Sequence, residues 1–210
     1  MHEAPRAVIF DMGNVLIDWN PRPALQPLFN TESELEAFFA NDWRLIYDAV
    51  HDRKDLPLAE CVHCLRHARP DLHGAIDIYV YRWAEFVRGT MDDSIAVVTE
   101  LANAGVALFG LTNWPAQVWP PQRVIRHTRY DFSFLDKFTD VVVSGVEQMR
   151  KPQACIYRLA LQRFGLDSTQ AVFVDDMAAN VEAARAQGID GIVFENARGL
   201  RESLRERALI

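Results

Sequence analysis

Four short segments carry side chains that could do chemistry, and the first is a turn that begins with Asp11. This aspartate directly follows an apolar run from Ala7 to Phe10. A carboxylate at the end of a buried strand lies where open α/β sheets bind ligands, and it can act as a nucleophile. The turn therefore predicts covalent catalysis by Asp11. Two residues later, Gly13 offers no side chain for proton transfer.

The second segment, Thr112 and Asn113, follows the apolar run from Val106 to Leu111. A hydroxyl and an amide at a strand end can donate hydrogen bonds to an oxyanion, and the dipole of a following helix would add to them. Read alone, the pair is also typical of an ordinary helix cap. Trp114 comes next, where it could border a pocket or pack the sheet against the residues inserted before it.

The third segment is Lys151, directly before Pro152. Because proline suits the first turn of a helix, this lysine could project its ammonium into the crevice and balance an anionic substrate. A solvated surface lysine is the alternative interpretation of this segment.

The fourth segment is Asp175 and Asp176, with Asn180 shortly after them. Two adjacent carboxylates should repel each other and Asp11 unless a hard cation coordinates them, and magnesium is the expected cation. An acidic helix N-terminus is the alternative. Asn180 could support either arrangement by hydrogen bonding.

Strand-like apolar runs alternate with amphipathic helical segments through most of the chain. The runs cover residues 7–10, 106–111, 141–143, 171–174 and 192–194, and the helical segments cover residues 94–104, 152–164 and 178–187. This alternation predicts right-handed crossovers around a doubly wound parallel α/β sheet. Gly165 and Gly188 lie where helix C-terminal caps are expected. All four chemical segments then fall beside strands of one sheet.

Almost a hundred residues separate the first two predicted strands, which is far more than a normal crossover. From about residue 21 to residue 90 the apolar spacing predicts helices throughout, with a capped helix start at Thr31. We therefore predict a catalytic core formed by residues 1–18 and 91–210, and a helical cap formed by residues 19–90. Its position after the first strand would place the cap over the carboxyl edge of the sheet.

The composition is that of a soluble globular protein, and it narrows the choice of partners. The 210 residues include 29 acidic and 22 basic side chains, for a net charge of −7, and no basic block stands out. We therefore expect no nucleic-acid partner. Without an eighteen-residue apolar run or a secretory signal, we also expect no membrane contact and a cytoplasmic location. The sequence leaves a homodimer open.

The three cysteines, Cys61, Cys64 and Cys155, argue against a disulfide framework, because their number is odd. Cys61, Cys64 and His67 lie near one face of a predicted helix, which suggests zinc. A fourth ligand with the usual paired spacing is not evident, so we expect reduced thiols and no zinc.

The order of the four segments resembles the haloacid dehalogenase (HAD) superfamily. Its members combine an aspartate nucleophile, a serine or threonine, a lysine and an acidic metal-binding motif, matched here by Asp11, Thr112, Lys151, Asp175 and Asp176. The resemblance covers nearly the whole chain, and the insertion looks like the helical cap of subclass I. The phrases FDMGNVLIDWNP, LTNW, VVVSGVEQMRKP and VFVDDMAANVEAARAQG look closest to glucose-1-phosphate phosphatases and to the phosphatase domain of some epoxide hydrolases.

This resemblance implies a magnesium-dependent phosphatase that acts on a small phosphorylated metabolite, such as a sugar phosphate, through an aspartyl-phosphate. Asp11 would attack phosphorus, and Lys151 would neutralise both the nucleophile and the phosphate. The other substrate contacts would come from Thr112 and Asn113, which would hold phosphoryl oxygens, and from Asn14 and Trp114.

The implied magnesium ligands are Asp11, Asp176 and the backbone carbonyl of Gly13, with Asp175 assisting directly or through water. Most phosphatases of this superfamily carry a second aspartate at the position of Gly13, where it protonates the leaving group. Glycine cannot do so, and proton transfer is left without a residue. Either the substrate has a good leaving group, or another carboxylate supplies the proton. Asp18, near the expected hinge of the helical cap, is the candidate for this second role.

Two other functions remain compatible with the sequence. A 2-haloacid dehalogenase would use Asp11 to displace halide from carbon and would need neither a proton nor a metal. Without a cation, however, Asp175 and Asp176 would oppose an anionic haloacid. A non-catalytic phosphate-binding protein of the same fold is the third interpretation, and Gly13 alone supports it.

Substrate choice is expected to come from the cap, where Trp43, Arg44, Tyr47, His51 and Arg53 lie close together in sequence. Aromatic and basic groups facing a crevice would suit a sugar ring or an anionic tail. The same spacing fits ordinary helix packing, which is the role we predict for Trp43 and Tyr47.

Overall fold

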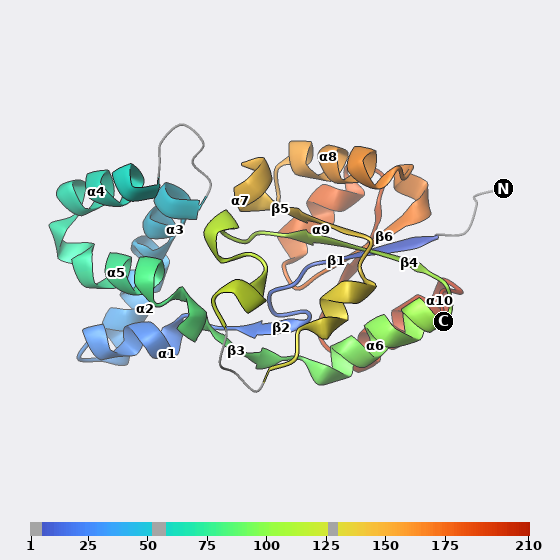
Figure 1. Ribbon diagram of the computed structural model, residues 1–210, viewed down its shortest axis with the longest axis horizontal. Coiled ribbons are helices and arrows are strands. Elements are labelled where there is room, and N and C mark those ends of the chain that lie inside the picture. The colour runs from blue at the N-terminus through green and yellow to red at the C-terminus, as the bar shows by residue number, and fades with distance from the viewer. Residues whose placement is uncertain (1–5, 52–57, 126–129) are drawn as a thin grey trace.

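A computed structural model of the chain describes residues 6–51, 58–125 and 130–210 (Figure 1). Its centre is a five-stranded parallel sheet with the strand order β5-β4-β1-β6-β7. The strands are β1 (Ala7–Phe10), β4 (Ala107–Thr112), β5 (Asp140–Val143), β6 (Ala171–Asp175) and β7 (Asp190–Val193). The chain winds outward in both directions from β1, so the predicted doubly wound sheet is confirmed.

Helices cover both faces of this sheet (Figure 1). One face is covered by α6 (Asp92–Asn103) and α10 (Ala197–Glu206), and the other by α8 (Ala154–Phe164) and α9 (Ala178–Arg185). Because side chains alternate along a strand, Val8 and Phe10 join one buried core while Ala7 and Ile9 join the other. In the described parts of the chain, no helix is long and apolar enough to cross a membrane.

The predicted helix ends are largely correct, with one exception. Gly165 ends α8 in the left-handed conformation, and Gly188, shortly after α9, has a positive φ as well. The placement of Pro152 in the first turn of a helix is wrong, because α8 begins only at Ala154. Residues 150–153 form a turn instead, closed by a hydrogen bond of 2.8 Å from the Gln153 N–H to the Arg150 carbonyl.

Between β1 and β4 the chain leaves the sheet and forms a group of helices at one end of the molecule, here called the lid (Figure 1). These helices are α1 (Arg22–Leu25), α2 (Glu32–Asn41), α3 (Trp43–His51), α4 (Leu58–Ala68) and α5 (His73–Tyr81). The predicted cap at Thr31 is confirmed, since its side chain accepts a hydrogen bond from the Glu34 N–H.

The lid is joined to the sheet by a short antiparallel ribbon of β2 (Ile17–Trp19) and β3 (Val87–Thr90), with Asp18 opposite Gly89. The prediction of helix throughout residues 21–90 is therefore wrong for β3. β3, where the chain returns from the lid, pairs with β2, where it enters the lid. The local spacing of apolar residues cannot predict such long-range pairing. The predicted domain boundaries, after residues 18 and 90, fall within this ribbon and at its end.

The remaining elements are single turns that connect the larger ones. They are α7 (Ser144–Glu147) and the 3-10 helices η1 (Gln26–Leu28), η2 (Pro70–Leu72), η3 (Trp83–Phe86), η4 (Ala116–Val118), η5 (Pro121–Arg123), η6 (Ser133–Lys137) and η7 (Ser168–Gln170). Two of these turns lie next to the site described below: η3 at the end of the lid, and η4 after the segment that follows β4.

Candidate active site

The structure brings the four chemical segments together at the carboxyl edge of the sheet. Asp11 follows β1, Thr112 ends β4 and Asp175 ends β6, and these three strands are neighbours. Lys151 comes from the turn before α8, and its Nζ lies 2.9 Å from Asp11 Oδ1 and 2.7 Å from Asp175 Oδ2. A single ammonium group thus joins two of the predicted carboxylates.

Lys151 is almost completely buried, and Asn113 holds its backbone. The Asn113 side chain donates to the Lys151 carbonyl (3.0 Å) and accepts from the Lys151 N–H (2.9 Å). Asn113 was predicted to hold a phosphoryl oxygen, but its amide matches the donor and acceptor of a peptide group and is used for that purpose here. The Asn113 side chain therefore holds Lys151 in position, while its contact with phosphate stays a prediction.

Asp175 is fully buried and has donors on both of its oxygens. Oδ2 accepts from Lys151, while Oδ1 accepts from the Met177 N–H (2.8 Å) and from Asn180 Nδ2 (2.9 Å). The Tyr157 hydroxyl donates in turn to the Asn180 carbonyl at 2.8 Å. This buried network fixes the orientation of the Lys151 ammonium.

Asp11 receives its hydrogen bonds from the described residues on one oxygen only. Oδ1 lies 2.7 Å from the Met12 N–H and 2.9 Å from Lys151 Nζ. The lone pairs of Oδ2 are therefore left for a substrate atom or a cation.

The acidic side chains fit a divalent cation. Carboxylate oxygens of Asp11, Asp175 and Asp176 all lie within 4.8 Å of one another. Burial raises the pKa of Asp11 to about 7, against the opposing charge of Lys151 and with a further contribution from Asp175. Burial and the Asp175 charge also raise the pKa of Asp176. Three hard carboxylates beside one ammonium leave excess negative charge, which magnesium would offset.

Asp11, Asp176 and Lys151 line a cavity of about 210 Å³ between the sheet edge and the lid. Its walls are Asp11, Gly13, Asn14, Trp19, Tyr47, Trp83, Thr112, Asn113, Trp114, Pro115, Lys151, Asp176, Met177 and Asn180. A larger hollow of about 560 Å³ lies where α6 and α10 begin, but it contains none of the predicted site residues. The chemistry identifies the smaller cavity as the candidate active site.

Asn14 and Gly13 shape the turn after Asp11. Asn14 has a φ of 55°, a left-handed conformation that asparagine tolerates, and its Oδ1 accepts from the Trp19 N–H at 3.2 Å. It also hydrogen-bonds Asp176, which partly offsets the rise in the pKa of that carboxyl. A Cβ on Gly13 would meet only the Trp19 Cβ, at 4.0 Å, so a side chain has room there.

The structure does not bring Asp18 into this cavity. Asp18 lies on β2 and lines an adjoining hollow of about 420 Å³, which shares Asn14 and Trp19 with the candidate active site. The carboxylate predicted as a substitute for the missing acid therefore stands outside the space that holds Asp11.

The lid residues predicted to select the substrate have different positions. Trp43 packs in an aromatic cluster, with ring centroids 5.4 Å from Phe39 and 5.5 Å from Tyr79, as predicted. Tyr47 packs against the same cluster and also lines the cavity. Arg44 is an exposed partner of Asp48, and His51 ends α3. Arg53 lies outside the described residues.

A salt bridge joins the lid to the turn formed by residues 150–153. Asp48 of α3 pairs with Arg150, the residue directly before Lys151. Burial opposes ionisation of Asp48, but the charges and hydrogen bonds of Arg150 and Arg44 together outweigh burial and lower the pKa of this carboxyl. The motifs did not predict this pair, because it joins segments far apart in the chain.

Two cavity residues, Trp19 and Trp83, were also missed. Trp83 of η3 packs against Trp114 with ring centroids 4.7 Å apart, so Trp114 both borders the pocket and wedges the sheet against the lid. In the sequence, Trp83 was recognised only as one of several apolar residues at helical spacing. Nothing local in the sequence indicated which tryptophan would face the site.

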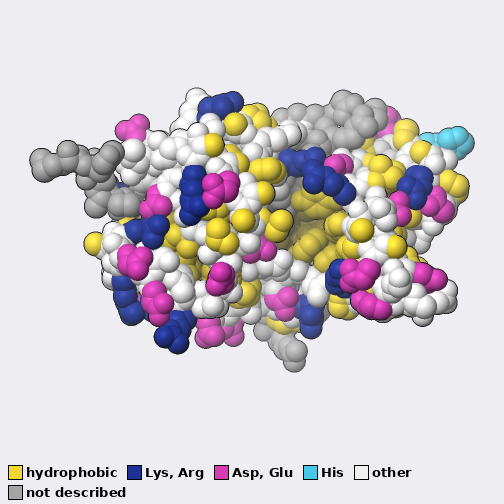
Figure 2. Space-filling model, turned by 180° about the vertical axis from the view of Figure 1, so that it is seen from behind, with side chains coloured by type: hydrophobic (Ala, Val, Ile, Leu, Met, Phe, Trp, Pro, Cys, Tyr) yellow, Lys and Arg dark blue, Asp and Glu magenta, His cyan; other side chains and the backbone are white. Residues whose placement is uncertain are grey.

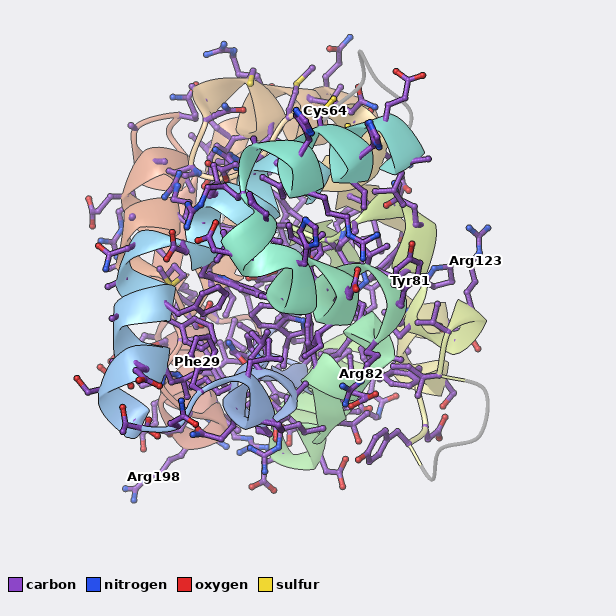
Figure 3. The ribbon with its side chains drawn as sticks, turned by 90° about the vertical axis from the view of Figure 1, so that its left-hand side faces the viewer. Phe29, Cys64, Tyr81, Arg82, Arg123 and Arg198 are labelled. Atoms are coloured by element: carbon purple, nitrogen blue, oxygen red, sulfur yellow. The ribbon has the colours of Figure 1, made fainter. Side chains whose placement is uncertain are left out.

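Cys61, Cys64 and Cys155 are not paired in disulfides in the structure, and their redox state stays a prediction. Cys61 is buried in α4 and Cys64 is exposed, on the outer side of the lid (Figure 3). In the described part of the chain, the acidic trio is the one group of potential metal ligands that lies close enough together.

Comparisons with known proteins identify the family of this chain. The profile of the haloacid dehalogenase-like hydrolase family matches residues 5–188. The sesquiterpene phosphatase astK of Aspergillus oryzae is 28% identical over 191 residues, which cover 89% of this chain and 88% of that protein. The drimenol cyclase drtB of Aspergillus calidoustus is 25% identical over 90% of this chain, which spans only 34% of that protein.

Solved structures show the same fold. An HAD family enzyme from Bacteroides thetaiotaomicron superposes with a TM-score of 0.69 at 18% identity, covering 92% of this chain and 95% of that one. Its complex with magnesium and inorganic phosphate has a TM-score of 0.65. A predicted HAD-like hydrolase from Porphyromonas gingivalis gives 0.71 at 18% identity, covering 97% and 99% of the two chains. With the family match over most of its length, this chain belongs to the haloacid dehalogenase-like hydrolases, as its motifs predicted.

Proposed function

We propose that this protein is a magnesium-dependent phosphatase that hydrolyses a small phosphorylated metabolite through an aspartyl-phosphate. The observation that carries the proposal is the buried Lys151 ammonium held between Asp11 and Asp175, beside a third carboxylate, Asp176. An ammonium in this position can neutralise both a nucleophilic carboxylate and an arriving phosphate. The relative named as a sesquiterpene phosphatase supports phosphate-ester chemistry for this chain.

The reaction would proceed in two displacements at phosphorus. First, Asp11 Oδ2 forms a bond to phosphorus while the bond to the leaving oxygen breaks. During this step Oδ1 stays hydrogen-bonded to the Met12 N–H and Lys151, and the buried Thr112 hydroxyl donates to a phosphoryl oxygen. Water then attacks phosphorus, the bond to Asp11 breaks, and phosphate leaves with the carboxylate restored.

Magnesium would be held by Asp11, Asp176 and the Gly13 carbonyl, all of which come from residues that line the cavity. When bound, it would supply positive charge to the phosphoryl oxygens. Asp175 would not bind the magnesium directly, because Lys151, Met177 and Asn180 already donate hydrogen bonds to its oxygens.

The leaving oxygen also needs a proton, and the usual donor is missing. Gly13 has no side chain, and Asp18 lies in the adjoining hollow. We propose that solvent water supplies this proton. Esters whose alcohols are more acidic should therefore react faster, because they need protonation less.

The arrangement favours phosphate transfer over halide displacement. A 2-haloacid dehalogenase would use the same Asp11 without a cation, and its anionic substrate would then approach three carboxylates that lie within 4.8 Å of one another. A magnesium-dependent reaction gives those carboxylates a role.

A panel of phosphate esters and 2-haloacids, each with and without magnesium, tests the proposal. We expect phosphate release from p-nitrophenyl phosphate with magnesium, and none from the Asp11→Asn variant used as the blank. Halide release without magnesium would reject the phosphatase in favour of a dehalogenase. Failure to turn over any phosphate would favour a non-catalytic phosphate-binding protein.

The stabilising effect of magnesium is expected to depend on pH. The pKa of Asp11 is raised to about 7 and that of Asp176 is raised as well, so below about pH 7 the cation must displace protons. The increase in Tm produced by millimolar magnesium should therefore be largest near pH 8 and small near pH 5. Differential scanning fluorimetry across this range measures it. An equal shift at both pH values would mean that these carboxyls do not bind the metal.

A further inference from the structure

The walls of the active-site cavity are formed by both polar and apolar groups. The polar side chains belong to the groups already assigned to phosphate, metal or their support: Asp11, Asn14, Thr112, Asn113, Lys151, Asp176 and Asn180. The rest of the lining is Trp19, Tyr47, Trp83, Trp114, Pro115 and Met177, together with Gly13. The part of a substrate beyond its phosphate therefore meets mainly aromatic and aliphatic surface.

The apolar part of this lining offers few side-chain partners for hydroxyl groups. Its polar side-chain atoms are the indole N–H groups and the Tyr47 hydroxyl, and the Trp114 indole N–H already donates to the Val118 carbonyl at 3.2 Å. A sugar ring placed here would lose water without regaining most of its hydrogen bonds, which disfavours binding. An apolar group would lose nothing comparable.

The apolar wall continues beyond the cavity. Trp83 and Pro115 also line a second hollow, of about 30 Å³, between α5 and η4. Its other walls are Leu58, Tyr79, Val80, Gln117 and Val118. From behind, Figure 2 shows a hollow between the lid and the core with hydrophobic side chains in its walls. A cavity of about 210 Å³ is small for a whole ligand, so a longer chain could continue along this shared wall.

We propose that the substrate is a phosphate ester of an apolar alcohol or phenol, with a leaving group that lies against Trp83 and Trp114 and extends toward the hollow beside η4. This inference rests on the proposed phosphatase function and specifies its substrate class. The phosphate is held at the sheet edge, while the lid and the segment after β4 recognise the hydrocarbon.

A homologous series of substrates tests this with the chemistry held constant. In 4-n-alkylphenyl phosphates the acidity of the leaving phenol hardly changes as the chain lengthens, so a trend in kcat/KM reports binding of the chain. We expect kcat/KM to rise about threefold for each buried methylene until the hollow is filled. A hydroxyl-ended analogue, 4-(3-hydroxypropyl)phenyl phosphate, should fall at least about fivefold below its 4-n-butyl isostere.

Two exposed glutamines provide matched variants. Gln117 lines the second hollow, whereas Gln26 lies on η1 and lines neither hollow. Gln117→Glu should lower kcat/KM for the longest ester by about threefold or more relative to phenyl phosphate, because the charge opposes an apolar chain. Gln26→Glu adds the same charge elsewhere and should alter neither.

The results separate this inference from the function on which it rests. A flat series, or a preference for the hydroxyl-ended ester, would overturn the apolar leaving group while leaving the phosphatase intact. A rising series in the wild-type protein supports it even if Gln117→Glu does not fold. Absence of turnover with every ester, p-nitrophenyl phosphate included, would instead reject the phosphatase function itself.

Discussion

Asp11→Asn is expected to abolish phosphatase turnover while making the folded protein more stable. An amide cannot form the aspartyl-phosphate, so kcat should fall by about 10⁴-fold or more. The geometry should survive, because the amide oxygen can still accept from the Met12 N–H and Lys151 as Oδ1 does now. Activity and stability are therefore expected to change in opposite directions.

The expected gain in stability follows from the raised pKa of Asp11. Its carboxyl titrates near 3.8 when exposed and near 7 in the folded protein, chiefly because it is buried. A raised folded-state pKa gives stability that is complete below the unfolded value and is lost as the pH rises to the folded one. Above pH 7 the ionised Asp11 thus opposes folding, and the amide should remove roughly 2 to 4 kcal/mol of that cost when magnesium is absent.

Urea denaturation between pH 4 and 8, with EDTA present, measures this effect. We expect the variant and the wild-type protein to have similar free energies of unfolding near pH 4 and to diverge by pH 8. Asp136→Asn removes a carboxylate at an exposed position and should show no such divergence. A less stable Asp11→Asn protein at pH 8 would mean that Lys151 requires the Asp11 charge, although Asp175 lies 2.7 Å from its Nζ.

The parallel core could be predicted because its signals are local. Each buried strand is a short apolar run, and the carboxylates Asp11 and Asp175 occur where two of these runs end. Parallel strands align their carboxyl ends at one edge, so the position of a residue along its own strand was enough to predict a shared site. The family resemblance then suggested the role of each of these residues.

The details that escaped prediction depend on contacts between distant segments. β3 is extended because it pairs with β2, and Trp83 faces the site because it packs on Trp114. Asn113 has a residue type that can bind an oxyanion, and the contact of its side chain with the peptide group of Lys151 was not predicted. In each case the local sequence allowed several conformations, and tertiary pairing selected one.

Gly13→Asp is expected to accelerate hydrolysis of esters with poor leaving groups by about 10² to 10⁴-fold, the usual contribution of general acid catalysis. The structure has room for the new side chain, since a Cβ at Gly13 meets nothing nearer than the Trp19 Cβ at 4.0 Å. An n-alkyl phosphate needs its leaving oxygen protonated and should gain most. The p-nitrophenolate of p-nitrophenyl phosphate leaves readily without a proton, so the rate with this ester should change little.

Gly13→Asn is the matched control, because its side chain has nearly the same size and no titratable proton. The dependence of kcat/KM on leaving-group pKa across substituted phenyl phosphates should be steep for the wild-type protein and for Gly13→Asn, and shallow for Gly13→Asp. A shallow dependence in the wild-type protein would mean that another group already supplies the proton. Asp18→Asn would then show whether the lid moves that carboxylate from the adjoining hollow to the leaving oxygen during turnover.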